Sequence, residues 1–154
     1  MNKQKLELAC RAVACDQWRW MEGMRGQDRV GRWFRVTGGA DGSRTFTVSY
    51  ELRLDIQLTR KAPSSMDRCM PDLSDPATLG CLLHLVREAW DDPLVWVERT
   101  NRFYAYDDRG TGCCDRAWVV HINTPPHLTR IPADTEIEAL IAALEAAMET
   151  EVEQ

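Results

Sequence analysis

Long apolar runs are absent from this chain of 154 residues. No stretch approaches the ~20 consecutive apolar residues that a membrane-spanning helix needs. The opening residues, MNKQKLELACRAVACDQW, carry charges where a secretory signal peptide has its apolar core. These two absences argue against an integral membrane protein and against an exported one. We therefore expect a cytoplasmic protein with no membrane partner.

The cysteine spacing of structural zinc sites is also missing. The six cysteines do not form the two C-x₂₋₄-C knuckles that such sites use. Cys69, Cys113, Cys114 and His121 are the residues that would supply metal ligands, but adjacent cysteines rarely both bind one ion. Residues 22–31 match neither a phosphate-binding loop nor a dinucleotide motif. We expect reduced thiols, no metal and no other cofactor.

Lysine is scarce, and the charge is unevenly placed. Only Lys3, Lys5 and Lys61 are lysines among the 19 basic residues, which we attribute to the codon usage of a GC-rich genome. The net charge is −5, yet residues 1–60 hold 11 basic and 7 acidic side chains whereas residues 61–154 hold 8 and 17. This distribution predicts a molecule with one basic and one acidic face.

The composition that is present is that of a folded domain. Hydrophobic residues make up 44% of the chain and charged residues 28%, which is ordinary usage for a globular protein. We see no internal repeat and no linker long enough to separate two domains. The expectation is a single domain over residues 1–154, with an acidic tail that frays from about residue 149.

Hydrophobic periodicity predicts three helices and several strands. Helices are expected at residues 3–16, at 76–90 after Asp75 as N-cap, and from a capping box that begins at Thr135. Strands are expected at 17–21, 32–36, 94–98, 102–106 and 117–123, with loops at 22–31, 60–76 and 124–134. Residues 46–59 alternate strictly between apolar and polar side chains, over a length that favours one long strand that bends or bridges two neighbouring strands. The class is α+β, a mostly antiparallel sheet with three amphipathic helices in a layered α/β/α sandwich.

Three stretches carry a resemblance to a known family. WRWMEGM after the first helix, PDLSDPATLGCLLHLVREAW in the middle and EIEALIAALEAA at the end are similar to small phage and prophage proteins with a phage ABA-sandwich domain. The resemblance covers about half of the chain, and the segment around residues 45–60 departs from it. It implies an α/β/α sandwich, a viral or prophage origin and an accessory role. No catalytic residues are implied, because none are established for the family.

One face of the central helix could carry thiol chemistry. Cys81, His84 and Glu88 stand at i, i+3 and i+7, so a thiol, an imidazole and an orienting carboxylate would follow one another. Helical nucleophiles normally sit at an N-terminus, where the helix dipole lowers the thiol pKa, and Cys81 is more than a turn inside. We therefore expect a structural helix face and no catalytic residues.

Two charged surfaces are candidates for binding. The amino-terminal part interleaves arginine with tryptophan, which suits a partner or a phosphate-bearing ligand; its candidate residues are Arg19, Arg25, Arg29, Arg32, Trp33 and Arg35. The alternative is that its tryptophans are core and its arginines line a solvated edge. The carboxy-terminal part offers an acidic surface that could mimic nucleic acid or simply be a solvated helix face, with candidate residues Glu138, Glu145, Glu149 and Glu151.

Three functional hypotheses follow. The first is a non-enzymatic phage or prophage accessory protein that binds and modulates a host protein, with an anti-defence role in an infected or lysogenic bacterium. The second is a sponge for a nucleotide signal, or a nucleic-acid binder, that uses the arginine and tryptophan surface. The third is a cryptic cysteine-dependent enzyme at Cys81 and His84. A homodimer formed through an exposed strand edge is compatible with each.

Overall fold

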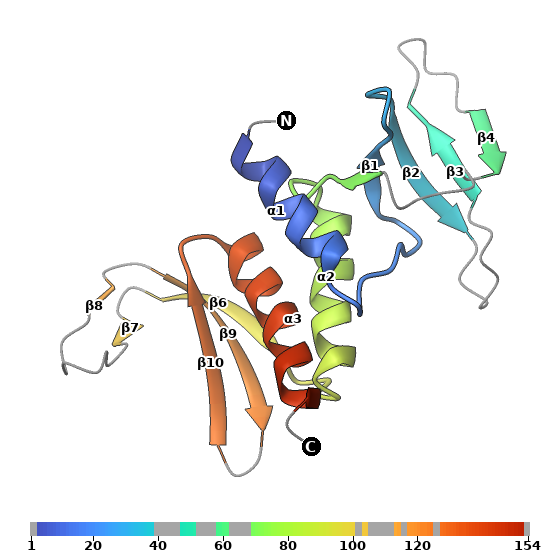
Figure 1. Cartoon of the computed structure of the whole chain (residues 1–154). Helices are drawn as coiled ribbons and strands as arrows, with labels where there is room; N and C mark the ends of the chain where they lie inside the picture. The colour runs from blue at the N-terminus through green and yellow to red at the C-terminus, as the bar shows by residue number, and fades with distance from the viewer. Residues whose placement is uncertain are drawn as a thin grey trace. The chain divides into compact units, whose positions relative to one another are not determined.

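The chain folds into an α+β structure whose paired strands are antiparallel, as predicted (Figure 1). The computed structural model describes residues 3–38, 47–51, 58–61, 69–100, 103–104, 113–114, 117–124 and 127–152. It divides into two compact units, Met1–Cys81 and Leu82–Gln154. The single domain over 1–154 stays a prediction. Within the described residues no helix has the length and apolar character that a membrane crossing requires.

The helices lie where the sequence predicts them. They are α1 (Lys3–Ala14), α2 (Pro76–Ala89) and α3 (Glu136–Val152). Asp75 caps α2, because its Oδ2 accepts the N–H of Thr78 at 3.0 Å, and Thr135 Oγ1 accepts the N–H of Glu138 at 3.2 Å to cap α3. Each capping side chain lies three residues before the N–H group that it binds. Because this separation is so short, both caps can be predicted from the sequence alone.

The carboxyl end of α2 uses an aspartate in a left-handed conformation. Asp91 has a φ of 47°. The N–H of Asp91 donates to the carbonyl of Glu88, and the N–H of Asp92 donates to the carbonyl of Arg87. This is the Schellman arrangement, in which the left-handed residue is usually glycine. Asp91 and Asp92 therefore end the helix within one residue of the predicted end at 90.

The first unit contains a five-stranded sheet in the order β4-β3-β2-β1-β5. Its strands are β1 (Arg25–Gln27), β2 (Trp33–Gly38), β3 (Thr47–Tyr50), β4 (Leu58–Lys61) and β5 (Met70–Pro71). Strands β3 and β4 pair with each other, so the two described ends of the alternating segment are neighbours and not one continuous strand. Residues 52–57 of that segment lie outside the described residues.

Three predictions about the first unit were wrong. Residues 17–21 form no strand, and strand β1 lies inside 22–31, which was expected to be a loop. The reason is Gly26, on which two aromatic rings pack: a Cβ there would lie 2.6 Å from Trp20 and 2.8 Å from Phe34. Its neighbours Gly23 and Gly31 are turn glycines with φ of 92° and 84°. Three glycines in one stretch thus have two different roles.

Strand β5 also lies in a segment that was predicted to be a loop, residues 60–76.

The second unit contains a three-stranded sheet in the order β10-β9-β6 and a short β7-β8 pair. Its strands are β6 (Trp96–Thr100), β7 (Phe103–Tyr104), β8 (Cys113–Cys114), β9 (Ala117–Thr124) and β10 (His127–Ala133). Helix α3 packs against β6, β9 and β10. The prediction of an irregular connection at 124–134 was wrong, since most of it is β10. Its Pro132 is tolerated because, among the described strands, β10 pairs only with β9.

Candidate functional site: the arginine-rich hairpin

The arginines singled out in the sequence gather on the hairpin formed by β1 and β2. Arg25 lies directly opposite Arg35 in the register of the two strands, and Arg35 lies opposite Ser49 of β3. Opposed residues of an antiparallel pair point to the same face of the sheet, and like charges placed there repel. The hairpin therefore requires negative charge close by. Four carboxylates supply this negative charge, and none of them was predicted to pair with an arginine.

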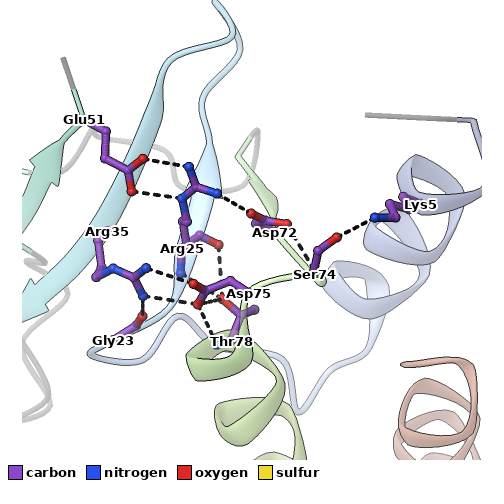
Figure 2. A network of polar contacts seen from close by, with 9 residues as sticks. All are labelled: Lys5, Gly23, Arg25, Arg35, Glu51, Asp72, Ser74, Asp75 and Thr78. Carbon is purple, nitrogen blue, oxygen red and sulfur yellow. Dashed lines mark hydrogen bonds and ion pairs between the residues drawn. The ribbon is translucent and has the colours of Figure 1, made fainter. Parts of the chain in front are cut away.

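Arg25 is held by two of these carboxylates (Figure 2). Its Nε and Nη2 donate to the two oxygens of Glu51 at 2.9 and 2.7 Å, and its Nη1 donates to Asp72 Oδ2 at 2.7 Å. The Glu51 hydrogen bonds are the largest cause that raises the pKa of Arg25, and they lower the pKa of Glu51. All three of these guanidinium nitrogens thus have carboxylate partners inside the unit.

Arg35 is bound by the N-cap of α2. Its Nη2 donates to Asp75 Oδ1 at 2.9 Å, and its Nη1 reaches Asp75 Oδ2 at 3.2 Å and the carbonyl of Gly23 at 2.6 Å. The buried Thr78 hydroxyl accepts the N–H of Arg25 at 2.9 Å and lies 3.1 Å from Asp75 Oδ2. The hydrogen bond from Arg35 is the main reason that the pKa of Asp75 lies below its usual value. Asp75 thus caps α2 and also neutralises the charge of Arg35 on β2.

The network continues through the loop before α2 (Figure 2). Asp72 Oδ1 accepts the N–H of Ser74 at 3.0 Å, and the Ser74 hydroxyl is 2.6 Å from Lys5 Nζ on α1. Two arginines and three carboxylates therefore form a clasp, which we define as Arg25, Arg35, Glu51, Asp72 and Asp75. Because three carboxylates outnumber the two arginines, the clasp is not an anion-binding site. It holds β1, β2 and the start of α2 together.

Arg32 is neutralised separately, in the turn between the strands. Asp28 is buried; its Oδ1 accepts the N–H groups of Val30 and Arg32, both at 3.0 Å, and its Oδ2 accepts Arg32 Nε at 2.8 Å. Desolvation raises the pKa of Asp28, but the hydrogen bonds from Arg32 and Val30 outweigh it, so the pKa is lowered overall. The Arg32 guanidinium also lies 4.8 Å from the Tyr50 ring centroid.

Two side chains of the turn, those of Arg29 and Val30, are left to solvent. Arg29 is exposed, and no hydrogen bond or ion pair joins it to another residue that the structure describes. Val30 is 66% exposed. The turn itself is well ordered by hydrogen bonds, since Gly31 donates its N–H to the carbonyl of Asp28 at 2.9 Å and Gln27 Nε2 donates to the carbonyl of Gly31 at 2.9 Å. We call Asp28–Gly31 the hairpin tip.

The other residues of the arginine and tryptophan surface range from exposed to half-buried. Trp33 is half-buried, with the Arg25 guanidinium 4.5 Å from its ring centroid. Arg19 is exposed and has a partner within the chain. Trp18 and Trp20 meet edge to face, and Trp20 is buried against Phe34. The structure thus brings Arg25, Arg35 and Trp33 together but leaves the hairpin without a cluster of unpaired cations.

The thiol face of α2 has ordinary contacts. Cys81 Sγ lies 3.6 Å from the carbonyl of Glu22, and His84 Nε2 lies 3.4 Å from Glu88 Oε1 on the exposed side of the helix. Burial raises the pKa of the Cys81 thiol, and the negative charge of Asp75 raises it further. A raised pKa reduces the thiolate fraction, which is the opposite of what a nucleophilic cysteine needs.

The metal and acidic candidates are only partly described. Cys69 is buried, whereas the side chains of Cys113 and Cys114 lie outside the described part. Among the described residues, no three histidine, cysteine or acidic side chains are grouped so as to hold a metal ion. Of the acidic surface, the described side chains are half-buried and belong to Glu138 and Glu145, while those of Glu149 and Glu151 lie outside the description.

Comparison of the chain with family models, with curated proteins and with solved structures finds no match. The contacts of the hairpin and its tip are therefore the observations on which a functional proposal can rest.

Proposed function

We propose that the chain is a phage or prophage accessory protein that binds and modulates a host protein in the cytoplasm of an infected or lysogenic bacterium. Its origin rests on the resemblance to phage ABA-sandwich proteins, and inhibition of antiviral defence is the role that this origin favours. The protein acts by binding and not by catalysis. The binding surface is the hairpin tip, with Arg29 and Val30 as the contacting side chains.

The ordered but solvent-exposed tip is the observation that carries this proposal. A buried aspartate, Asp28, accepts three hydrogen bonds that fix the turn, while the side chains of Arg29 and Val30 contribute little to the fold. A loop already held in one conformation loses less entropy on binding than a mobile loop. Arginine is among the residue types most enriched at energetically important positions of protein interfaces. Because no residue that the structure describes pairs with the Arg29 guanidinium, the partner should supply a carboxylate, beside a small apolar pocket for Val30.

The same contacts count against the two alternative functions. A nucleotide sponge needs unpaired cations for phosphate, and Arg25, Arg32 and Arg35 are each bound to carboxylates of this chain. The raised pKa of Cys81 counts against a thiol enzyme. Both arguments come from the described residues of the first unit.

A comparative pull-down from a host lysate tests the proposal. The bait is the full chain, and the test variant combines Arg29→Glu with Val30→Ser. The matched control combines Lys3→Glu with Leu6→Ser, which changes an exposed cation and an exposed apolar residue on α1. We expect one host protein to be retained by the wild type and the control, and its affinity, measured with the purified partner, to fall at least about tenfold in the tip variant.

Two results would contradict it. Equal retention by the tip variant and the wild type would mean that the tip is not the binding surface. A melting temperature raised by saturating cyclic or linear nucleotides would favour the sponge. Circular dichroism of each variant confirms that a loss of binding is not a loss of folding.

A further inference from the structure

The three-stranded sheet of the second unit has an unusual histidine at its centre. In the register of β6, β9 and β10, Trp96 lies opposite His121, and His121 lies opposite Arg130. Glu98 lies two residues along β6 from Trp96. Opposed residues and alternate residues share a face of an antiparallel sheet, so these four side chains lie on one face.

His121 contacts two exposed side chains on this face. Its ring stacks on the Trp96 indole with centroids 4.5 Å apart and planes at 4°, and its Nε2 lies 3.0 Å from Glu98 Oε1. His121 is only 7% exposed, whereas Trp96 is 41% exposed and the Glu98 side chain 54%. The buried histidine therefore fixes an exposed aromatic ring and an exposed carboxylate side by side.

The fold alone does not account for this histidine. Its Nδ1 is buried and has no hydrogen-bond partner among the described residues. An unsatisfied buried polar atom typically costs about 1–3 kcal/mol, so an apolar side chain would suit the position better for stability. Both polar and stacking contacts of the ring are made to side chains that face solvent. What the histidine achieves is their positioning.

An aromatic face next to a carboxylate is a recognition site for a cation. The ring quadrupole attracts an ammonium or guanidinium group within about 6 Å of its centroid, and the carboxylate accepts its N–H groups. Residues 82–154 hold 6 basic and 14 acidic side chains, a net charge of −8, so the surrounding field favours positive ligands. Arg130 lies on the same face, opposite His121 in the register of β9 and β10, so one positive charge of this chain is already present there.

Two exposed apolar side chains belong to the same unit, and one of them, Leu128, lies on the same face of the sheet as His121. Leu94 and Leu128 are 66% and 42% exposed. The Asp92 carboxylate joins the residues before β6 to β9, since it accepts the N–H of Leu94 and the N–H of Asn123, both at 2.8 Å, and Asn123 lies opposite Leu128. We propose that Trp96 and Glu98, positioned by His121, bind an arginine or lysine side chain in a basic segment of a partner protein. This site is separate from the hairpin tip and does not depend on the function proposed for it.

The test uses the full chain and a short capped peptide that alternates glycine with arginine. The control peptide replaces arginine with citrulline, which has the same planar shape but no charge. Binding is followed through the indole N–H signal of Trp96 in a heteronuclear NMR titration. We expect the arginine peptide to shift this signal, the citrulline peptide to leave it in place, and a lysine peptide to behave like the arginine peptide.

Variants separate the site from general charge attraction. Trp96→Leu and Glu98→Gln should each weaken peptide binding about fivefold, whereas Glu88→Gln, an exposed carboxylate on α2, should have no effect. His121→Phe keeps an aromatic stack but cannot hold Glu98, so it should weaken binding while leaving stability unchanged or higher. The tip variant should bind the peptide as the wild type does.

Three outcomes would overturn the proposal: no binding of the arginine peptide, equal binding of the citrulline peptide, or equal losses in Glu88→Gln and Glu98→Gln. A shift of the Trp96 signal by an oligothymidylate instead of the basic peptide would also overturn it, because the site would then recognise nucleic acid.

Discussion

The two units use charge in opposite ways. In the first unit, arginines and carboxylates pair across β1, β2 and the start of α2, and the pairs determine which elements come together. In the second unit, α3 buries an apolar stripe, which consists of Ala139, Leu140, Ile141, Ala143 and Leu144. Carboxylates such as Glu98 remain at its surface. Most described arginines of the first unit are therefore paired within the fold, whereas the second unit keeps carboxylates such as Glu98 exposed.

Truncation of the core should have the largest effect, and it should be similar in both units. Phe34 and Leu144 are fully buried. Phe34→Ala should destabilise the protein by about 3–5 kcal/mol and Leu144→Ala by about 2–5 kcal/mol, because each leaves a cavity. Hydrogen exchange read on peptides of each unit should show the loss mainly in the unit that carries the change. A cost below about 1 kcal/mol for either would mean that the side chain is not part of a packed core.

Removing a carboxylate should lower stability more in the first unit than in the second. Asp75→Ala should cost about 1–3 kcal/mol, since it removes the α2 cap and leaves the partly buried Arg35 without its partner. Asp75→Asn keeps the cap and should recover about 1 kcal/mol of the loss. The matched change in the second unit, Glu88→Ala, should have almost no effect because its pair with His84 is exposed. Urea unfolding measures all three, and equal costs at Asp75 and Glu88 would remove the contrast.

Acid should weaken the first unit through the same carboxylates. The pKa values of Asp28, Glu51 and Asp75 lie below their ordinary values. In each case desolvation by burial raises the pKa, and hydrogen bonds outweigh it. At Glu51 these come from arginine, and at Asp28 and Asp75 they come from arginine and from backbone N–H groups. The unfolded chain therefore binds more protons, so the stabilisation is complete above an unfolded pKa of about 4 and is lost as the pH falls through the folded values. Urea unfolding from pH 7 to pH 3 should show this decline.

Asp75→Asn provides the control for that decline. Because it removes one of the three titrating carboxylates, its stability should fall less steeply with acid than that of the wild type. The difference between the two proteins should narrow below about pH 4. Parallel pH profiles would show that the Arg35 contact does not contribute.

The smallest predicted effect is a stabilisation at the end of α2. Asp91 has a left-handed φ that glycine adopts at no steric cost, and its carboxylate lies at the negative end of the helix dipole. Asp91→Gly should therefore raise stability by about 0.5–1 kcal/mol, visible as a higher melting temperature. Asp91→Ala should instead lower it. A higher melting temperature for Asp91→Ala than for Asp91→Gly would mean that the Schellman turn does not form.

Short-range signals explain most of what could be predicted about the fold. Strand β5 and the glycine-containing β1 gave no such signal, since they are strands only because a neighbour pairs with them. The prolines in 124–134 concealed β10 for a related reason: proline is excluded from a central strand but not from an edge. The arginines were identifiable as a cluster, but their carboxylate partners were not, because Arg25 and Asp72 are 47 residues apart.

Local chemistry within the chain was enough to establish the three helices, their caps and the α+β class, because each depends on residues within a few positions of one another. The tertiary structure decided which charges are neutralised within the chain and which remain exposed to solvent. Arg25 and Arg29 look equivalent in the sequence, yet the first is bound by two carboxylates and the second is left at the hairpin tip. His121 likewise acquires its stack on Trp96 and its contact with Glu98 only through strand register, which no single segment specifies.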